Sequence, residues 1–565
     1  MAAGTRVTGH RRVLVALIAM TAVAIALRLI DLDGRMAHWD EARVAYWTLR
    51  YHELGVWEYH PVVHGPFLFH VNEFIFGLIG PDDVSMRLIV ALIAGAAPLA
   101  AWLYRDHLEP IELIALAGFL TVNPVLLYYG RFSRNDVMLA VVMLVAFGLL
   151  VRAHASGRSW YLYPAGAAIG LGFAMKENAL LYLLCWAGAI IALLVHRVAY
   201  EHAALRLGRP TTPWALRETW RDRLPMQPRR WIRDGLLGVV AGVSVLVFFY
   251  APRGTDDPGL GDLVTTPWRL PAVVEASVIE GARRLVDHWI IGSRGPAYLD
   301  SLEFYLEVIA AGALVVTILA IVGFLLEHRR VEGPRWLVIV ALVWGLLSVG
   351  GYPYAGTINA PWLVAHMVVP LSIPAAVALG ALVSIVIEGV DRSDLLQTVG
   401  AGLIVLAAVS LVLWPAYGLV YDDPTGYDNE LVQYAQPGGD WSETIEQMEA
   451  LAAANEGVDV LYVGDTFATD DLDGAAYKQA GAGWYSRLPL PWYTEAFGAS
   501  TVSESSRSSA RAVIDHDQPP VIIVTAGQAR HVEGLVSTYE LREHEIRHGD
   551  FDIHIYLDLD RLDDQ

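Results

Sequence analysis

The sequence predicts a mainly α-helical membrane protein, a bundle of about eleven transmembrane helices followed by a small extracellular α/β domain. Of its 565 residues, 55% are hydrophobic and 18% are charged, whereas soluble proteins carry about 25% charged residues. The mean hydropathy is +0.41. Long apolar runs end near residue 420, and acidic residues prevail after it. We therefore divide the chain into a membrane domain, 1–420, and an acidic domain, 421–565.

Eleven apolar runs are long enough, or nearly so, to cross a bilayer, which takes about 17–25 residues in a helix. The first run resembles a signal peptide in its position, but Arg28 and the lack of a small-residue cleavage site favour a retained helix. The runs cover residues 13–30, 88–104, 111–130, 137–151, 160–174, 179–195, 235–250, 304–326, 336–350, 363–387 and 395–420.

Arginines in the connections predict the orientation. One set of alternate connections, which includes the N-terminus and the segment 197–233, holds 19 basic residues. Positively charged loops face the cytoplasm. An odd number of spans then places 421–565 outside the cell, together with the long first loop 31–87 and the shorter loops 131–136 and 176–178.

The charge distribution excludes several classes of protein. The formal net charge is -20, which offers no footprint for nucleic acid. Cys185 is the single cysteine, so a disulfide scaffold is excluded. Only Lys176 and Lys478 among the 40 basic residues are lysines. An acidic, lysine-poor surface fits a halophilic archaeon, where salt screens the repulsion; an ordinary acidic surface in a GC-rich organism is the alternative.

The acidic domain has the pattern of a small α/β fold. Segments 458–465, 519–527 and 551–560 are typical of strands, and 442–457 and 506–516 of amphipathic helices. A glycine-rich nucleotide fingerprint is absent from a strand-to-helix turn. The aromatic loop 483–493 could stack on a sugar, or it could be an interfacial or packing loop.

Two adjacent carboxylates, Asp40 and Glu41, follow the first span. One of them can accept a proton from a hydroxyl while the other orients it or binds a cation. Each raises the proton affinity of the other, which suits a general base. The alternative is an N-cap and first-turn pair at the start of a helix over 41–54.

Two further clusters are expected on the same face of the membrane. Arg134 and Asp136 lie in the turn between the third and fourth spans, where arginine could hold a lipid phosphate; interfacial snorkelling is the alternative. Lys176, the only lysine of the membrane domain, suggests a point-charge contact to phosphate. Its alternative is an interfacial pair with Glu177.

Histidines in the first loop raise the question of a zinc site. His60, His64 and His70 lie close to Glu73, and such residues are zinc ligands. Pro61 interrupts the stretch that contains His60 and His64. We therefore do not expect a structural metal.

Taken in order, these motifs resemble the GT-C superfamily, which includes the protein O-mannosyltransferases, the lipid A aminoarabinose transferases and the oligosaccharyltransferases. The string HWDEARVAYWTLRYHELGVWEYHPVVHGPFLFH, with YYGRFSRNDVM and GFAMKENALL, also resembles the haloarchaeal flippase activity-associated membrane proteins of N-glycosylation. The first resemblance covers 1–420, and the second covers the whole chain.

The resemblance implies an enzyme that uses a dolichyl- or polyprenyl-phosphate sugar and glycosylates a lipid-linked glycan or a protein at the membrane. It assigns Asp40 as the base with Glu41 as its catalytic partner. It places the donor phosphate near Arg134, Asp136, Lys176 and His64, although Gly65 replaces a proline of the mannosyltransferase turn. Because oligosaccharyltransferases use a divalent cation, it also allows a weak cation site at Asp40 and Glu41.

Two other functions compete with the glycosyltransferase. A non-catalytic protein that assists translocation of a lipid-linked sugar is the first, suggested by the flippase-associated family. A secondary transporter is the second, and it is disfavoured because Asn123-Pro124 is a single helix break rather than one of a pair.

Overall fold

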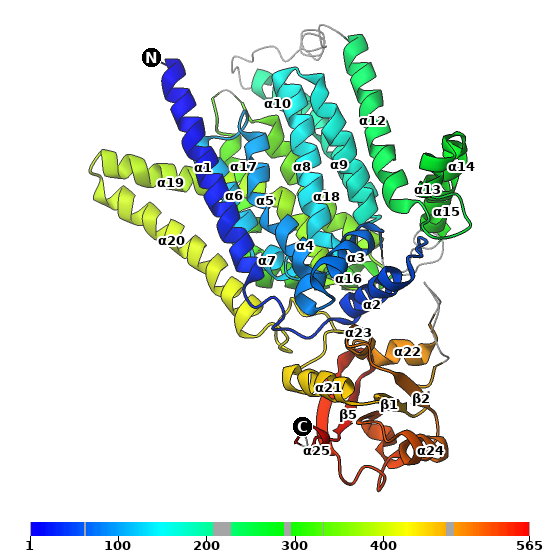
Figure 1. Ribbon diagram of the computed structural model, residues 1–565. Helices are drawn as coiled ribbons and strands as arrows, with labels where there is room; N and C mark the ends of the chain where they lie inside the picture. Colours follow the sequence, from blue (N-terminus) through cyan, green and yellow to red (C-terminus); the bar gives the residue numbers. More distant parts are fainter. Residues whose placement is uncertain are drawn as a thin grey trace.

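The computed structural model describes residues 2–60, 64–206, 228–287, 295–331, 333–469 and 480–563. A bundle of long helices carries a smaller α/β domain at one end, and the N-terminus lies at the opposite end of the bundle (Figure 1). Two short helices, α2 (Trp39–Leu54) and α3 (Phe67–Ile79), lie where the bundle and the C-terminal domain meet. The predicted mainly α fold class is confirmed.

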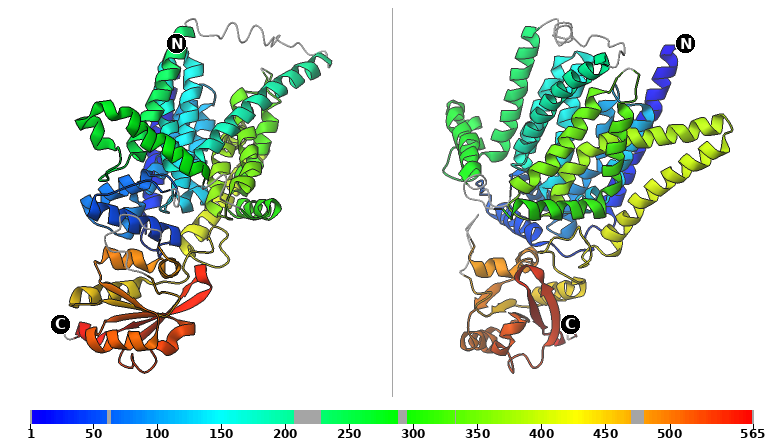
Figure 2. Two further views of the ribbon diagram at one scale, coloured as in Figure 1. Left: turned by 90° about the vertical axis from the view of Figure 1, so that its right-hand side faces the viewer. Right: turned by 180° about the vertical axis from the view of Figure 1, so that it is seen from behind.

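Long apolar helices make up the bundle, and short helices connect some of them. The bundle contains α1 (Ala2–Leu29), α4 (Asp83–Gly95), α5 (Ala97–Ala100), α6 (Pro110–Val122), α7 (Pro124–Tyr129), α8 (Asn135–Ser156), α9 (Leu162–Met175), α10 (Ala179–Arg206), α12 (Pro228–Tyr250), α16 (Tyr298–Gly312), α17 (Leu314–Glu327), α18 (Trp336–Ala355), α19 (Ala365–Asp391) and α20 (Leu395–Tyr417). Helices α13 (Leu260–Thr265), α14 (Leu270–Val274) and α15 (Glu280–Leu285) lie beside it (Figure 2).

In the described part of the chain, eight helices are long and apolar enough to cross a membrane, or nine if the bent pair α16 and α17 forms one span. They match nine of the eleven expected runs. The run 111–130 breaks into α6 and α7 at Asn123, because Pro124 cannot continue the helix. The run 160–174 is α9, which has only 14 residues. Most of the arginine-rich connection, 207–227, lies outside the described residues.

Helices α9 and α12 approach closely through glycines. Gly166 and Gly170 on α9 face Gly238 and Gly242 on α12, with the small-x-x-x-small spacing of membrane helix pairs. A Cβ atom on Gly242 would lie 2.7 Å from the carbonyl oxygen of Gly166. Any larger residue there would push the two helices apart.

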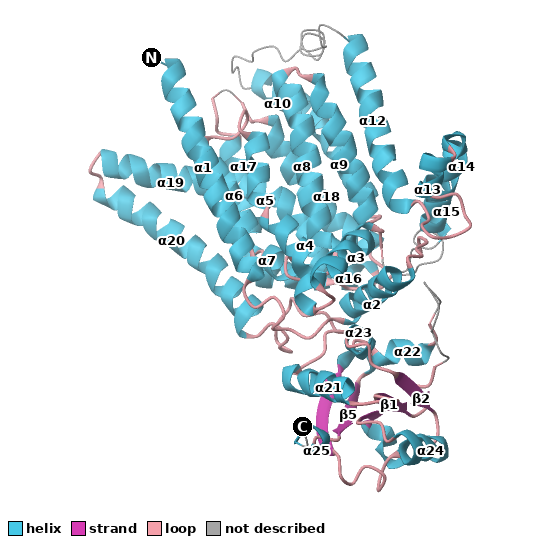
Figure 3. Ribbon diagram, viewed as in Figure 1, coloured by secondary structure: helices cyan, strands magenta, loops and turns pink. Residues whose placement is uncertain are grey.

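The C-terminal domain is a five-stranded sheet with helices packed around it (Figure 3). The strand order is β2-β1-β3-β5-β4; β2, β1 and β3 run parallel, and β5 and β4 are antiparallel additions. The strands are β1 (Val460–Val463), β2 (Thr501–Glu504), β3 (Val521–Thr525), β4 (Glu540–Ile546) and β5 (Phe551–Leu557), and the helices are α21 (Ser442–Ala454), α22 (Ala482–Arg487), α23 (Leu490–Ala496), α24 (Arg507–Asp517) and α25 (Asp560–Asp563).

Helix α2 shares a hydrophobic core with the C-terminal domain. Trp47 of α2 packs in one cluster with Trp484 of α22 and Trp492 of α23. Asp83, at the start of α4, accepts hydrogen bonds from Trp492 and Tyr493, both at 2.8 Å. Much of the predicted aromatic loop therefore serves packing, and it fixes the C-terminal domain on the first loop.

Candidate active site

Helix α2 begins with a capping box that directs its first carboxylates. The backbone N–H of Asp40 donates to the Nδ1 atom of His38 at 3.0 Å, and the backbone N–H of His38 donates to Glu41 at 3.0 Å. The Nε2 atom of His38 lies 2.7 Å from the side-chain oxygen of Gln433. Burial lowers the pKa of His38 to about 4, so the ring is neutral at neutral pH. Sequence reasoning assigned no role to His38, although its spacing from Glu41 fits a capping box.

Glu41 is completely buried and fully occupied by donors. Its carboxylate accepts hydrogen bonds from Arg87 at 3.1 and 3.2 Å and from the backbone N–H of Ser133 at 2.6 Å, and it pairs with Arg35 at 2.9 Å. Burial acts to raise the pKa of Glu41, but the two arginines outweigh it and the pKa falls below its ordinary value. Glu41 thus takes the place expected of a first-turn residue, and its contacts join α2, α4 and the turn after α7.

Asp40 begins a chain of polar contacts that crosses the site. Its carboxylate forms an ion pair with Arg134, and the Nη2 atom of Arg134 donates to the Nε2 atom of His64 at 2.7 Å. The Nδ1 atom of His64 lies 3.2 Å from Glu177, which accepts a hydrogen bond from Tyr59 at 3.3 Å. The guanidinium of Arg134 also lies 4.1 Å above the ring of Trp362.

The charges around Asp40 keep it ionised. Burial acts to raise the pKa of Asp40, but the charge of Arg134, helped by weaker contributions that include His64, outweighs it and the pKa is lowered. Burial and the nearby Lys176 lower the pKa of His64. A neutral His64 accepts from Arg134 with Nε2 and donates to Glu177 with Nδ1, which is the arrangement that the distances describe.

A second buried cluster lies on the other side of Arg134. Lys176, whose residue is 3% exposed, donates to Asp136 at 2.7 Å. His366 lies 3.1 Å from the same carboxylate oxygen and 2.7 Å from the hydroxyl of Tyr182. The other oxygen of Asp136 is 3.7 Å from the Nε atom of Arg134. Lys176 therefore pairs with Asp136. It does not form the interfacial pair with Glu177, which contacts His64 instead.

The structure thus gathers all six predicted site residues at one end of the bundle, beside the C-terminal domain. Arg134 contacts both Asp40 and His64. Asp136 lies near the Nε atom of Arg134 and accepts a hydrogen bond from Lys176. Glu41 accepts a hydrogen bond from the backbone of Ser133, the residue before Arg134. Among the described residues, no three His, Cys, Asp or Glu side chains are grouped for a metal ion. At the cation site that the resemblance allows, Asp40 pairs with Arg134 and Glu41 pairs with Arg87.

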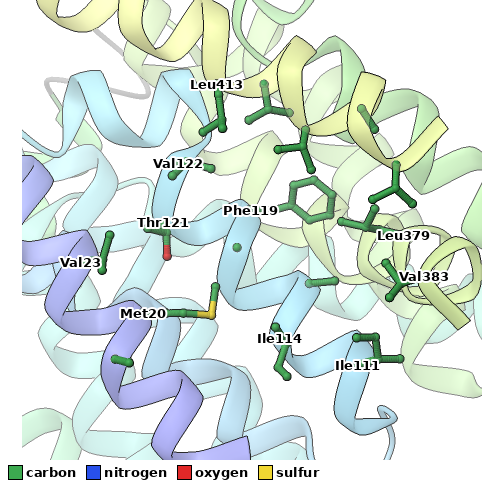
Figure 4. Close-up of a pocket in the computed structure, with 17 residues that line it drawn as sticks. Met20, Val23, Ile111, Ile114, Phe119, Thr121, Val122, Leu379, Val383 and Leu413 are labelled. Carbon is green, nitrogen blue, oxygen red and sulfur yellow. The ribbon is translucent and has the colours of Figure 1, made fainter. Parts of the chain in front are cut away.

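An apolar cavity of about 510 Å³ lies within the bundle, between α1, α6, α19 and α20 (Figure 4). Met20 and Val23 line it from α1, Phe119 from α6 and Leu413 from α20. Helix α6 continues through α7 into the turn that carries Arg134.

Two family models match the sequence. Residues 61–207 match the dolichyl-phosphate-mannose-protein mannosyltransferase model, and residues 441–558 match the C-terminal domain of Agl23 flippase-associated proteins. The first match contains His64, Arg134, Asp136 and Lys176. No functionally curated protein matches the chain.

Solved structures of two other proteins share the fold. The apo structure of ArnT from Cupriavidus metallidurans aligns with a TM-score of 0.55 and 15% identity over 95% of this chain and 97% of that one; its complex with undecaprenyl phosphate gives 0.52. The apo oligosaccharyltransferase of Archaeoglobus fulgidus gives 0.51 with 12% identity, over 90% of this chain and 69% of its own. The chain therefore shares the fold of these structures, with one segment that matches the mannosyltransferase model and a C-terminal domain that matches the Agl23 flippase-associated model.

Proposed function

We propose that the protein is a membrane glycosyltransferase that moves a sugar from a dolichyl- or polyprenyl-phosphate donor to a hydroxyl of a lipid-linked glycan or a protein. The observation that carries this proposal is the contact between Asp40 and Arg134, with His64 on the far side of the guanidinium. A base and a phosphate-binding cation are the two groups that such a transfer requires side by side.

In the proposed step, the acceptor oxygen attacks the anomeric carbon and Asp40 takes its proton. The new carbon–oxygen bond forms as the bond between the anomeric carbon and the phosphate oxygen breaks. The electron pair of that bond leaves with the polyprenyl phosphate, so the anomeric configuration inverts. Arg134, held by His64 and backed by Asp136 and Lys176, stabilises the departing phosphate through charge-assisted hydrogen bonds.

The ion pair between Asp40 and Arg134 links donor binding to the strength of the base. While Arg134 faces Asp40, its charge keeps the pKa of Asp40 low against the opposing effect of burial, and a weakly basic carboxylate accepts protons poorly. A donor phosphate that binds Arg134 would compete for its charge. The proton affinity of Asp40 would then rise only when the donor is present.

The lipid chain and the orientation complete the proposal. ArnT was solved with undecaprenyl phosphate, and the apolar cavity along α6 suits a similar chain. The N-terminus would lie in the cytoplasm and the C-terminal domain outside, which places the site on the outer face. Nucleotide sugars are absent there, so a lipid must deliver the sugar.

A protein that assists translocation of a lipid-linked sugar is the second candidate, favoured by the C-terminal match. Asp40→Asn separates the two, because it keeps the size of the side chain and removes the base. The variant and an Asp300→Asn control on exposed Asp300 of α16 would be returned to cells that lack the gene, and surface glycans would be analysed by mass spectrometry.

We expect Asp300→Asn to restore the complete glycan. Asp40→Asn should be made in equal amount and give the truncated glycan of the deletion, since a positioned base contributes about 10²–10⁴-fold in rate. A complete glycan from Asp40→Asn cells would refute the glycosyltransferase and favour assisted translocation.

A further inference from the structure

A second cavity, an open depression of about 510 Å³, lies between α2 and the C-terminal domain. Its walls are contributed by Trp39, Arg43, Ala482, Tyr485, Ser486 and His548. The rings of Trp39 and Tyr485 are stacked with centroids 5.7 Å apart, and the ring of His548 lies 5.0 Å from that of Trp39. Aromatic faces of this kind pack against the apolar face of a pyranose, while the edges stay open to its hydroxyls.

The aromatic wall is held in place without a ligand. The indole N–H of Trp39 donates to the backbone oxygen of Tyr485 at 3.1 Å. Trp484, next to Tyr485, is buried in the core shared with α2. Binding would therefore require little ordering of these side chains, which favours affinity.

Arg43 is the unusual member of the cavity. Its residue is 6% exposed, its Nη2 atom donates to the hydroxyl of Tyr485 at 3.1 Å, and its guanidinium lies over the rings of Trp39 and Tyr485. Within the described ranges, its Nε atom has no hydrogen-bond partner and no carboxylate lies within salt-bridge distance of it. Two helical turns later, Arg50 pairs with both Glu53 and Glu495.

A buried guanidinium that forms no ion pair is unfavourable unless a negative charge reaches it. Asp40 acts on Arg43 through its charge, but Asp40 forms its ion pair with Arg134. The C-terminal domain is strongly acidic overall, so an anionic ligand needs a dedicated cation to approach it. Arg43 supplies that cation between two aromatic faces. An anionic group on a stacked sugar would compensate its charge with a geometry that guanidinium favours.

The cavity is also placed beside the proposed base. Trp39 directly precedes Asp40 in α2. Burial lowers the pKa of His548, and the charge of Asp40 opposes that effect, so Asp40 is within electrostatic reach of the opposite wall. A sugar in the cavity would thus have its hydroxyls near the carboxylate.

We infer that this cavity is the acceptor site and that the acceptor is a saccharide carrying an anionic group, stacked on Trp39 and Tyr485 and paired with Arg43. The inference rests on the proposed function, because it takes Asp40 to be the base. Binding can nevertheless be measured without turnover, so the two can fail separately.

The test uses the full chain in detergent and ligand-observed saturation-transfer NMR. The probes are methyl β-glucuronide and methyl β-glucoside, which differ in the carboxylate at C6. We expect the glucuronide to bind at least about fivefold more tightly, and Arg43→Gln to remove this preference. Ser486→Phe, which fills the cavity without removing a wall, should abolish binding of both. Arg511→Gln, at an exposed arginine of α24, is the matched control and should bind like the wild type.

Asp40→Asn separates this inference from the proposed function. If Asp40→Asn blocks transfer but still binds the glucuronide, the proposed function and the inferred acceptor site are both supported. If transfer continues, the proposed function fails, and the binding measurements alone then show whether the cavity is a saccharide site. Equal binding of the two probes, or a preference that survives Arg43→Gln, would overturn the inference. Inorganic phosphate binding at Arg43 with no saccharide bound would also overturn it, since the cavity would then be a phosphate site.

Discussion

Lys176 offers a direct test of how the site is built, because it can either hold Asp136 or contact the donor phosphate. Its ammonium lies 2.7 Å from Asp136, and both residues are at least 97% buried. Lys176→Met would leave a buried carboxylate with only His366 and the more distant Arg134. Removing one partner of a buried ion pair costs about 3–5 kcal/mol.

The double variant Lys176→Met with Asp136→Asn removes both charges. His366 can still hydrogen-bond to an asparagine, so we expect the double variant to be more stable than the sum of the two single changes predicts. The coupling free energy should be about 2–3 kcal/mol. Chemical unfolding of the detergent-solubilised wild type, the two single variants and the double variant measures the four free energies of this double-mutant cycle.

Arg392→Met provides the matched control. Arg392 pairs at 3.3 Å with Glu388, and both side chains are exposed, so its loss should cost about 0–1 kcal/mol. If Lys176→Met cost no more than Arg392→Met while donor use collapsed, Lys176 would be a direct phosphate contact, and the supporting role assigned here would be refuted.

Three further predictions concern stability. Glu41→Gln should lower the free energy of unfolding by about 3–5 kcal/mol, because buried Arg87 and partly buried Arg35 lose their counter-charge; a protein as stable as the wild type would contradict this. Gly242→Leu should separate α9 from α12 and lower the thermal unfolding temperature, whereas Gly400→Leu, where a side chain meets nothing within 4 Å, should not; equal temperatures for the two would refute the glycine contact. The pKa of His38 falls from an ordinary value near 6.5 to about 4, so the unfolded chain binds more protons between those pH values and stability should drop by up to about 3 kcal/mol as pH falls through them. His38→Asn keeps a capping side chain and should flatten this slope in pH-dependent unfolding; an unchanged slope would assign it to other groups.

The parts of the fold that follow from local pattern could be predicted from the sequence. Long apolar runs marked the spans, and the buried strands β1, β3 and β5 coincide with the expected segments. Strands β2 and β4 were missed because both are edge strands with many polar residues, and their strand character depends on pairing with a neighbour. The break at Asn123 divided one expected span that hydropathy alone read as continuous.

The candidate site was predictable in its members but not in their contacts. Residue types and the expected topology brought Asp40, Arg134 and Lys176 to one face. The partners of Glu41 could not be foreseen, because Arg87 and Ser133 come from other elements far along the chain. The cavity at Trp39 and Arg43 depended on α22 folding back on α2, a tertiary contact that no local spacing records.

The most direct test of the central claim is a structure of the full chain with a polyprenyl phosphate bound. We expect the phosphate oxygens to lie about 2.7–3.2 Å from the guanidinium of Arg134, with the Asp40–Arg134 pair opened and the lipid chain in the apolar cavity along α6. A phosphate bound elsewhere, with the Asp40–Arg134 pair intact, would contradict the assignment of this site to transfer from a lipid-linked donor.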